Sequence, residues 1–171
     1  ITLTSGSDQK VYNGKPLTKD EVNITGDGFV EKEGVTWEVT GSQTEVGSSK
    51  NTFTYSFNEG TKEQNYKVTK VEGNLTVVPS EDTVTVTIKG NSGTEKYDGT
   101  EKTVTGYKVI SISDPKYLGT DFAFEGNAEA KGTDAGTYNM ELKPEDFTNI
   151  NKNFKNVVFV IEDGTLTITQ R

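Results

Sequence analysis

The chain has 171 residues, with 18 basic and 26 acidic side chains, a formal net charge of −8, and neither Cys nor His. Without Cys or His there is no Ser-His-Asp triad, no Cys nucleophile and no conventional structural zinc site. The acidic balance also argues against nucleic-acid binding, which needs clustered Lys and Arg, and the only Arg is Arg171.

The composition favours a folded, β-rich chain. Only 30% of the residues are hydrophobic, which together with the high charge also fits disorder. However, the β-branched residues Thr and Val number 26 and 17, and both suit a pleated, half-buried surface. Eight Phe, seven Tyr and a recurring apolar–polar alternation then favour β-sheets. No apolar run approaches the roughly 18–20 residues that cross a bilayer. Because the sequence lacks an initiating Met, Ile1 is predicted to mark an excised segment.

In the first half, the predicted strands are separated by a turn and a short helix. Asn-Gly tolerates positive φ, so Tyr12-Asn13-Gly14 is predicted to be a turn. One helical turn is predicted at 18–22, where the sequence resembles a capping box. Residues 35–39 and 52–57 alternate apolar and polar side chains, which predicts strands with one buried face.

The second half follows a similar plan. Tyr97-Asp98-Gly99 is predicted to be a turn. Residues 143–147 are predicted to form one or two helical turns, because Pro144 suits the first turn and acidic residues suit a helix N-terminus. Alternation predicts strands at 84–88, 122–124, 137–142 and 165–168.

Four landmarks recur in the same order in both halves, at offsets that drift only from 85 to 91 residues. The pairs are the two Tyr-Asx-Gly turns, 44–47 with 133–136 and the strands that follow them (52–57 and 137–142), 64–67 with 152–155, and 72–77 with 163–168. Two homologous domains are therefore predicted at 1–79 and 83–171. Residues 80–82 are predicted to be a linker, because Pro79 cannot supply a strand N–H and the polar residues after it favour exposure. A domain this small buries only around 60% of its unfolded surface, which leaves no room for a deep cofactor cavity.

The aromatic residues allow two interpretations. Tyr12 and Tyr97 are either exposed ligand platforms or core anchors before a turn, and their matched positions favour anchors. Trp37 could stack on a sugar, but it alternates in phase with Val35 and Val39, which favours burial. Phe122 and Phe124 are predicted to occupy the corresponding strand of the second domain.

The other chemistry-bearing patterns are weak. Acidic loops at 20–27, 98–101 and 114–121 could donate oxygens to calcium, but none has EF-hand spacing, and solvated turns are favoured. Pairs of carboxylates for glycoside hydrolysis are inevitable among 26 acids and carry little signal.

The sequence contains the residue types for two covalent modifications. A Lys–Asn or Lys–Asp cross-link has candidates in Lys10 or Lys96 with Asn65 or Asn153, but no partner carboxylate can be assigned. Glycosylation sequons begin at Asn23 and Asn74, and they would matter only in a eukaryotic secretory protein.

Several of these segments resemble a known family. The Tyr-Asp-Gly turn, residues 131–138, Asn153-Phe154 and residues 163–168 are similar to the Mub-like β-grasp repeats of Gram-positive surface proteins, also called MBG or YDG-type domains. The second half matches better, because the first has Val46-Gly47-Ser48 where Ala-Gly-Thr-Tyr is typical. The resemblance implies a secreted, wall-attached protein with serial modules, some adhesive and many acting as stalks. It carries over no catalytic residue.

The expected fold is mostly β (α+β at most), with two tandem β-grasp-like domains, each a mixed sheet with one short helix or crossover. The expected function is a non-catalytic repeat module at the bacterial cell surface, acting as an extended stalk or spacer. The alternative is an adhesin that binds host glycoproteins or glycans. We expect no catalytic, metal-binding or cofactor-binding residues and no cofactor, and ligand-binding residues cannot be assigned. The expected partners are flanking repeats of the same chain, without nucleic acid or membrane insertion, and the chain is expected to be monomeric.

Overall fold

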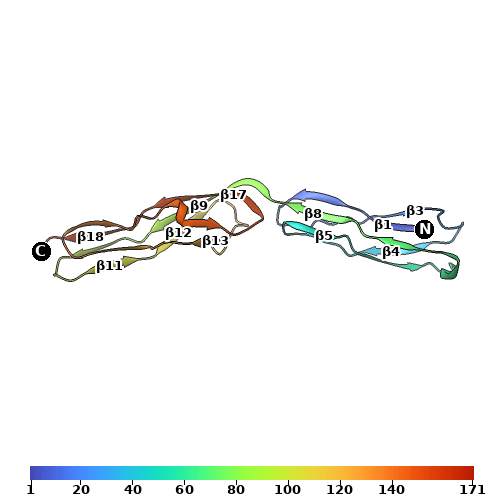
Figure 1. The fold of residues 1–171 in the computed structure, drawn as a ribbon, viewed down its shortest axis with the longest axis horizontal. Coiled ribbons are helices and arrows are strands. Elements are labelled where there is room, and N and C mark those ends of the chain that lie inside the picture. Colours follow the sequence, from blue (N-terminus) through green and yellow to red (C-terminus); the bar gives the residue numbers. More distant parts are fainter. The chain divides into compact units, whose positions relative to one another are not determined.

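In the computed structural model, which describes all residues 1–171, the chain divides into unit 1, Ile1–Ser80, and unit 2, Glu81–Arg171. Both units are built from β-strands in mixed sheets, which confirms the mostly β part of the predicted fold class (Figure 1). The only helices are two three-residue 3-10 helices, η1 (Glu63–Asn65) and η2 (Pro144–Asp146). The predicted linker at 80–82 is extended instead, because these residues begin the long strand β9 (Ser80–Gly90). No helix is long and apolar enough to cross a membrane.

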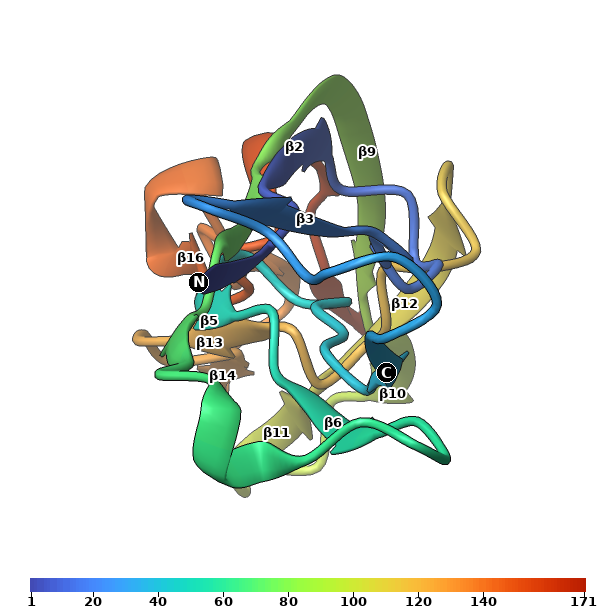
Figure 2. The same ribbon diagram turned by 90° about the vertical axis from the view of Figure 1, so that its right-hand side faces the viewer.

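Unit 1 contains three small sheets. Its strands are β1 (Thr2–Ser5), β2 (Asp8–Val11), β3 (Val22–Thr25), β4 (Val35–Val39), β5 (Gly47–Lys50), β6 (Phe53–Phe57), β7 (Thr69–Val71) and β8 (Asn74–Val78). The sheet orders are β3-β1-β7, β2-β8-β5 and β4-β6. The pairs β1–β7 and β2–β8 are parallel, and all the others are antiparallel. Figure 2 shows the N-terminal end of this unit, with β3 beside β1.

Unit 2 has a related order of strands. After β9 come β10 (Gly93–Lys96), β11 (Lys102–Thr105), β12 (Tyr107–Ile112), β13 (Phe122–Phe124), β14 (Glu129–Gly132), β15 (Gly136–Asn139), β16 (Phe147–Asn149), β17 (Phe154–Glu162) and β18 (Thr165–Thr169). The sheet orders are β12-β9-β17, β10-β18-β15, β11-β14 and β13-β16. Strand β10 is parallel to β18, as β2 is to β8 in unit 1.

The predicted alternation of buried and exposed faces is confirmed. Val84, Val86 and Ile88 of β9 are fully buried, while the residues between them are partly exposed. In unit 1, one cluster of buried side chains contains Leu3, Val22 and Phe53, and a second contains Leu17, Leu75 and Val77. Each unit 1 cluster forms beneath a different three-stranded sheet, so the first and last strands must change sheets along their length.

The change of sheet in unit 1 occurs where two glycines meet. Residues 2–11 and 69–78 run side by side in one constant register, interrupted between β1 and β2 and between β7 and β8. A Cβ on Gly73 would lie 2.5 Å from the carbonyl oxygen of Gly6, so only glycine allows the backbones to approach this closely. Two serine hydroxyls bridge the interruption: Ser5 Oγ accepts the N–H of Gly73 at 2.9 Å, and Ser7 Oγ accepts that of Asn74 at 3.0 Å.

Several hydrogen bonds of unit 1 have counterparts in unit 2, although that of Ser5 does not, because Gly90 holds its place. Ser92 Oγ accepts the N–H of Thr165 at 3.0 Å, as Ser7 does for Asn74. The N–H of Tyr97 donates to the carbonyl of Thr169, as that of Tyr12 donates to Val78. A Cβ on Gly90 would clash with the backbone of Gly164, and one on Gly164 with the carbonyl of Asn91. The two units therefore share one backbone plan.

The two units differ in the side chain of the residue that bonds to Gly73 in unit 1 and to Gly164 in unit 2. Asn51 donates its backbone N–H to the carbonyl of Gly73, and Met140 donates to that of Gly164. Asn51 is fully buried, and its Nδ2 also donates to the carbonyls of Gly6 and Lys19. The same position thus holds a buried amide in unit 1 and a thioether in unit 2.

Three local predictions have different outcomes. The helix predicted at 143–147 is confirmed as η2, where Asp146 accepts the backbone N–H of Lys143. The helical turn predicted at 18–22 is wrong, because the carbonyls of Lys19 and Glu21 are needed by Asn51 and Gly6, and Val22 begins β3.

The predicted match between strands 52–57 and 137–142 is also wrong. Strand β15 pairs with β18 as β5 pairs with β8, whereas β6 pairs with β4 as β16 pairs with β13. Only two residues separate β5 from β6, but residues 140–146, including η2, separate β15 from β16. The longer connection in unit 2 therefore places the counterpart of β6 later in the sequence, at β16.

The close approach of the backbones at Gly164 predicts a large effect of a single methyl group. We expect Gly164→Ala to lower the free energy of unfolding of unit 2 by at least about 2 kcal/mol, because the added Cβ would meet fixed backbone atoms. Gly119→Ala is the matched control, since a Cβ there meets nothing within 4 Å. Urea denaturation of both variants tests this, and equal stabilities would contradict it.

Candidate functional site

The ends of three strands create the candidate site at the C-terminal edge of unit 2. Strand β18 is the centre of the sheet β10-β18-β15, with β10 parallel and β15 antiparallel to it. The residues after β10, those after β18 and those before β15 therefore meet at one edge. The N–H of Tyr97 donates to the carbonyl of Thr169 at 2.9 Å, which fixes the turn beside the last strand.

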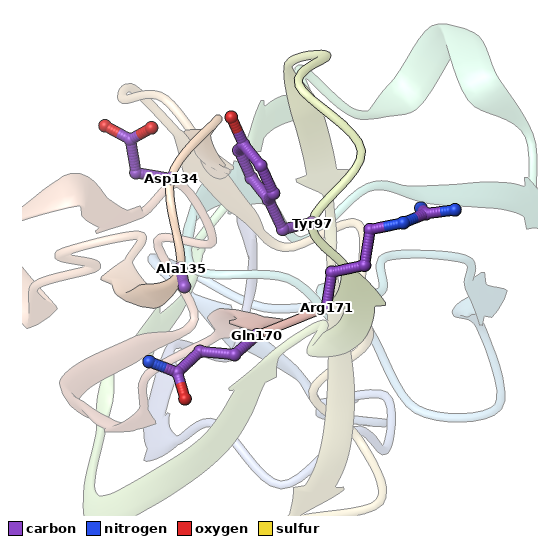
Figure 3. Close-up of a pocket in the computed structure, with 5 residues that line it drawn as sticks. All are labelled: Tyr97, Asp134, Ala135, Gln170 and Arg171. Carbon is purple, nitrogen blue, oxygen red and sulfur yellow. The ribbon is translucent and has the colours of Figure 1, made fainter.

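A shallow hollow of about 440 Å³ lies at this edge (Figure 3). It is lined by Tyr97, Asp134, Ala135, Gln170 and Arg171. The Tyr97 side chain is 38% exposed, and its ring stands up from the backbone with the hydroxyl outward. The carboxylate of Asp134 and the guanidinium of Arg171 point in different directions from it. The hollow thus offers an exposed aromatic ring with an acid, an amide and a base around it.

The turn that follows Tyr97 is fixed by hydrogen bonds to the carboxylate of Asp98. Asp98 accepts hydrogen bonds from the backbone N–H and hydroxyl of Thr100, and lies 2.7 Å from the ammonium of Lys102. The Lys102 ammonium, followed by the Thr100 donors, holds the pKa of Asp98 well below its usual range. The same carboxylate raises the pKa of Lys102. Asp98 is exposed and Lys102 only half-buried, so this pair orients the turn rather than stabilising the fold strongly.

The two turn tyrosines differ. Tyr12 is half-buried and packs against the cluster of Leu17, Leu75 and Val77, as expected of a core anchor. Tyr97 is not an anchor, because its ring faces the hollow. The prediction that both tyrosines pack on the core therefore holds only for Tyr12.

Trp37 lies on the inner face of the β4–β6 pair, as predicted. It is directly opposite Tyr55 and packs against the cluster of Leu3, Val22 and Phe53, but it remains half-buried. A small hollow of about 200 Å³ lies along this pair. Phe122 of β13 is buried at the matching position in unit 2.

In the loop at 114–121, carboxylates accept hydrogen bonds from backbone N–H groups of the same loop. Asp114 accepts the N–H of Lys116, and Asp121 accepts that of Leu118. Nowhere do three acidic side chains come together in a group that could hold a metal ion. The burial of Tyr117 in this loop was not predicted from the sequence. Tyr117 is 2% exposed and packs edge-on to Phe154.

The candidate cross-link pairs lie apart. Lys10 pairs in register with Val77 near the C-terminal end of unit 1, and its ammonium contacts Asn13 and the carbonyl of Lys15. Asn65 precedes β7, at the other end of that unit. In unit 2, the lengths of β17 and β18 separate Asn153 from Lys96.

Sequence reasoning missed the contributions of Ala135, Gln170 and Arg171 to the hollow. The Tyr-Asp-Gly turn and the segment 133–136 were both recognised as landmarks, but separately. Only the register of β10 and β15 on β18 brings them together. The β10–β18 pairing joins residues 73 positions apart, and no local pattern encodes it.

Comparison with known proteins gives one match. A family model described as MBG domain matches residues 83–170, which is nearly all of unit 2. No curated protein and no solved structure is significantly similar to the chain.

The burial of Tyr117 predicts an alkaline loss of stability. Burial, followed by the charge of Asp121, raises the pKa of Tyr117 to about 12. Because this pKa lies above the ordinary value of about 10, the folded state holds a proton that the unfolded state releases. We expect about 2–3 kcal/mol of stability to be lost between about pH 10 and pH 12.

Tyr117→Phe isolates this effect. The variant loses the hydrogen bonds to Asp121 and Asn149, at a cost of about 1 kcal/mol at neutral pH. The stability difference between the wild type and the variant should then shrink and reverse above about pH 10, as measured by urea denaturation across pH. A difference that stays constant with pH would show that Tyr117 titrates normally.

Proposed function

The chain belongs to the MBG domain family through residues 83–170, and from this membership we propose that it is a non-catalytic repeat module of a bacterial cell-surface protein, acting as an extended stalk or spacer. The resemblance of its turns and terminal strands to Mub-like repeats of Gram-positive surface proteins supports an extracellular, wall-attached setting.

We infer that unit 1 is a second copy of the same domain. The support comes from hydrogen bonds at matching places: the backbone pairs Tyr12–Val78 and Tyr97–Thr169, and the serine bridges at Ser7 and Ser92. In this proposal both units are tandem β-grasp-like domains, and further copies flank them. Series repeats add length at little folding risk, because each has its own core.

The direction of the chain through each unit carries the proposal. In unit 1 the first and last strands are parallel neighbours, with Thr2 beside Thr69 and Val11 beside Val78. A chain arranged in this way begins a unit at one end and leaves it at the other. In Figure 1 the N-terminus lies at one end of unit 1, and β8 runs toward the opposite end. Units joined in this way extend a stalk, whereas units whose ends meet would not.

The hollow at Tyr97 supports a second function, binding of host glycoproteins or glycans. An exposed aromatic ring beside hydrogen-bonding side chains suits the face and hydroxyls of a sugar. The hollow is shallow, so affinity would depend on many copies acting together.

Solution scattering tests the stalk. A single globule of this length has a radius of gyration of about 15–16 Å, and each unit alone about 12 Å. Two units in line should give about 20 Å or more by the same scaling. A value of about 16 Å would reject the extended stalk.

Bead-binding tests the adhesin alternative. The chain would be displayed on beads against mucins, immunoglobulins, matrix proteins and glycans, with Tyr97→Ala as the variant and Leu118→Ala, also exposed, as the control. If the hollow binds a glycan, Tyr97→Ala should abolish a saturable, glycan-competed signal that Leu118→Ala retains. No signal from the clustered wild-type chain would reject the adhesin and leave the spacer.

A further inference from the structure

We propose that the first and last strands of each unit form a mechanical clamp, which resists tension applied along the chain. The proposal rests on the stalk function only for the source of the tension. A surface stalk is pulled at its two ends, and the tension enters each unit through its first strand and leaves through its last.

The parallel pairing places the clamp in shear. In unit 1 the tension on Thr2 and that on Val78 act at opposite ends of two neighbouring strands that point the same way. The interstrand hydrogen bonds of a sheet lie across the strand direction. Pulling the strands past one another therefore loads all of these bonds together, whereas peeling strands apart from one end loads them one at a time.

The clamp in unit 1 is continuous. It begins at the hydrogen bond from Thr69 N–H to the Ile1 carbonyl and ends at the bond from Tyr12 N–H to the Val78 carbonyl, both 2.8 Å. At the interruption between sheets, the hydroxyls of Ser5 and Ser7 take over the pairing. The close approach of Gly6 and Gly73 prevents a gap at this point.

The loaded strands are also the best-supported ones. At the N-terminal end of unit 1, the strand under tension is β1, which lies at the centre of β3-β1-β7. At the C-terminal end, it is β8, which lies at the centre of β2-β8-β5. Each strand is thus held on both sides at the end where it is pulled. The change of sheet at the glycines makes this possible, because each strand is central in one sheet and an edge in the other.

Unit 2 repeats the arrangement. Strand β9 is the centre of β12-β9-β17, and β18 is the centre of β10-β18-β15. At the N-terminal end, Asn156 donates to the carbonyl of Glu81 at 2.8 Å, and Lys155 lies 3.6 Å from the Glu81 carboxylate. At the other end, Tyr97 N–H donates to Thr169.

Single-molecule force spectroscopy tests the clamp. Because the chain has no Cys, two added cysteines are its only attachment points. One version carries them on extensions beyond Ile1 and Arg171, which shears both clamps. The other carries Glu101→Cys and Gln170→Cys, both at exposed positions after β10 and β18, which peels these strands apart. At equal loading rate, we expect a several-fold higher rupture force for end-to-end pulling. Equal forces would overturn the clamp.

A pair of variants in unit 1 locates the resistance. Ser7→Ala removes the acceptor for Asn74 N–H inside the clamp, and Thr61→Ala removes the acceptor for Gly34 N–H outside it, each at 3.0 Å. We expect Ser7→Ala to lower the end-to-end rupture force of one unfolding event and Thr61→Ala to leave it unchanged, although urea denaturation should show similar losses of stability. Equal effects on force would overturn the assignment of the resistance to these strands.

The clamp and the stalk can fail separately. A compact radius of gyration would reject the stalk while high shear forces would still support the clamp. A radius of 20 Å or more with equal forces in both pulling directions would support the stalk and reject the clamp.

Discussion

The close contact of two backbone segments at paired glycines is the constraint on which the rest of the structure depends. A Cβ on Gly73 in unit 1, or on Gly90 or Gly164 in unit 2, would clash with backbone atoms of the facing segment. The contact lets the first and last strands stay neighbours while each moves from the centre of one sheet to the edge of another. This exchange divides the core of unit 1 into two clusters, Leu3–Val22–Phe53 and Leu17–Leu75–Val77. It also sends the chain out at the end opposite to the one where it began.

The two units show that one backbone plan accepts different chemistry at its centre. Asn51 stabilises unit 1 by donating to the carbonyls of Gly6 and Lys19, in addition to its backbone bond to Gly73. In unit 2, Met140 keeps the backbone bond and fills the space with an apolar chain, packed with Leu142 and Leu166. A buried amide with both donors used and a flexible thioether are physically alternative solutions.

The sequence predicted those features that short-range physics decides. The alternation at Val84, Val86 and Ile88, the Asn-Gly and Asp-Gly turns, and Pro144 at the start of η2 follow from side-chain periodicity and backbone preference. Features that depend on distant partners were not predictable. Residues 18–22 resemble a capping box, but their carbonyls accept hydrogen bonds from Gly6 and Asn51. Tyr97 and Arg171 line one hollow only because β10 pairs with β18.

If the contact between the first and last strands holds each unit together, these strands should be the last to separate when the unit unfolds. Amide hydrogen exchange measures this most directly. The amides of Gly73, Asn74 and Thr165 bond across the contact of the two segments. The account predicts that they exchange only through global unfolding, with protection matching the full free energy of unfolding of their unit. Exchange of these amides as fast as that of exposed loop amides, at denaturant concentrations where the β4–β6 pair stays protected, would contradict it.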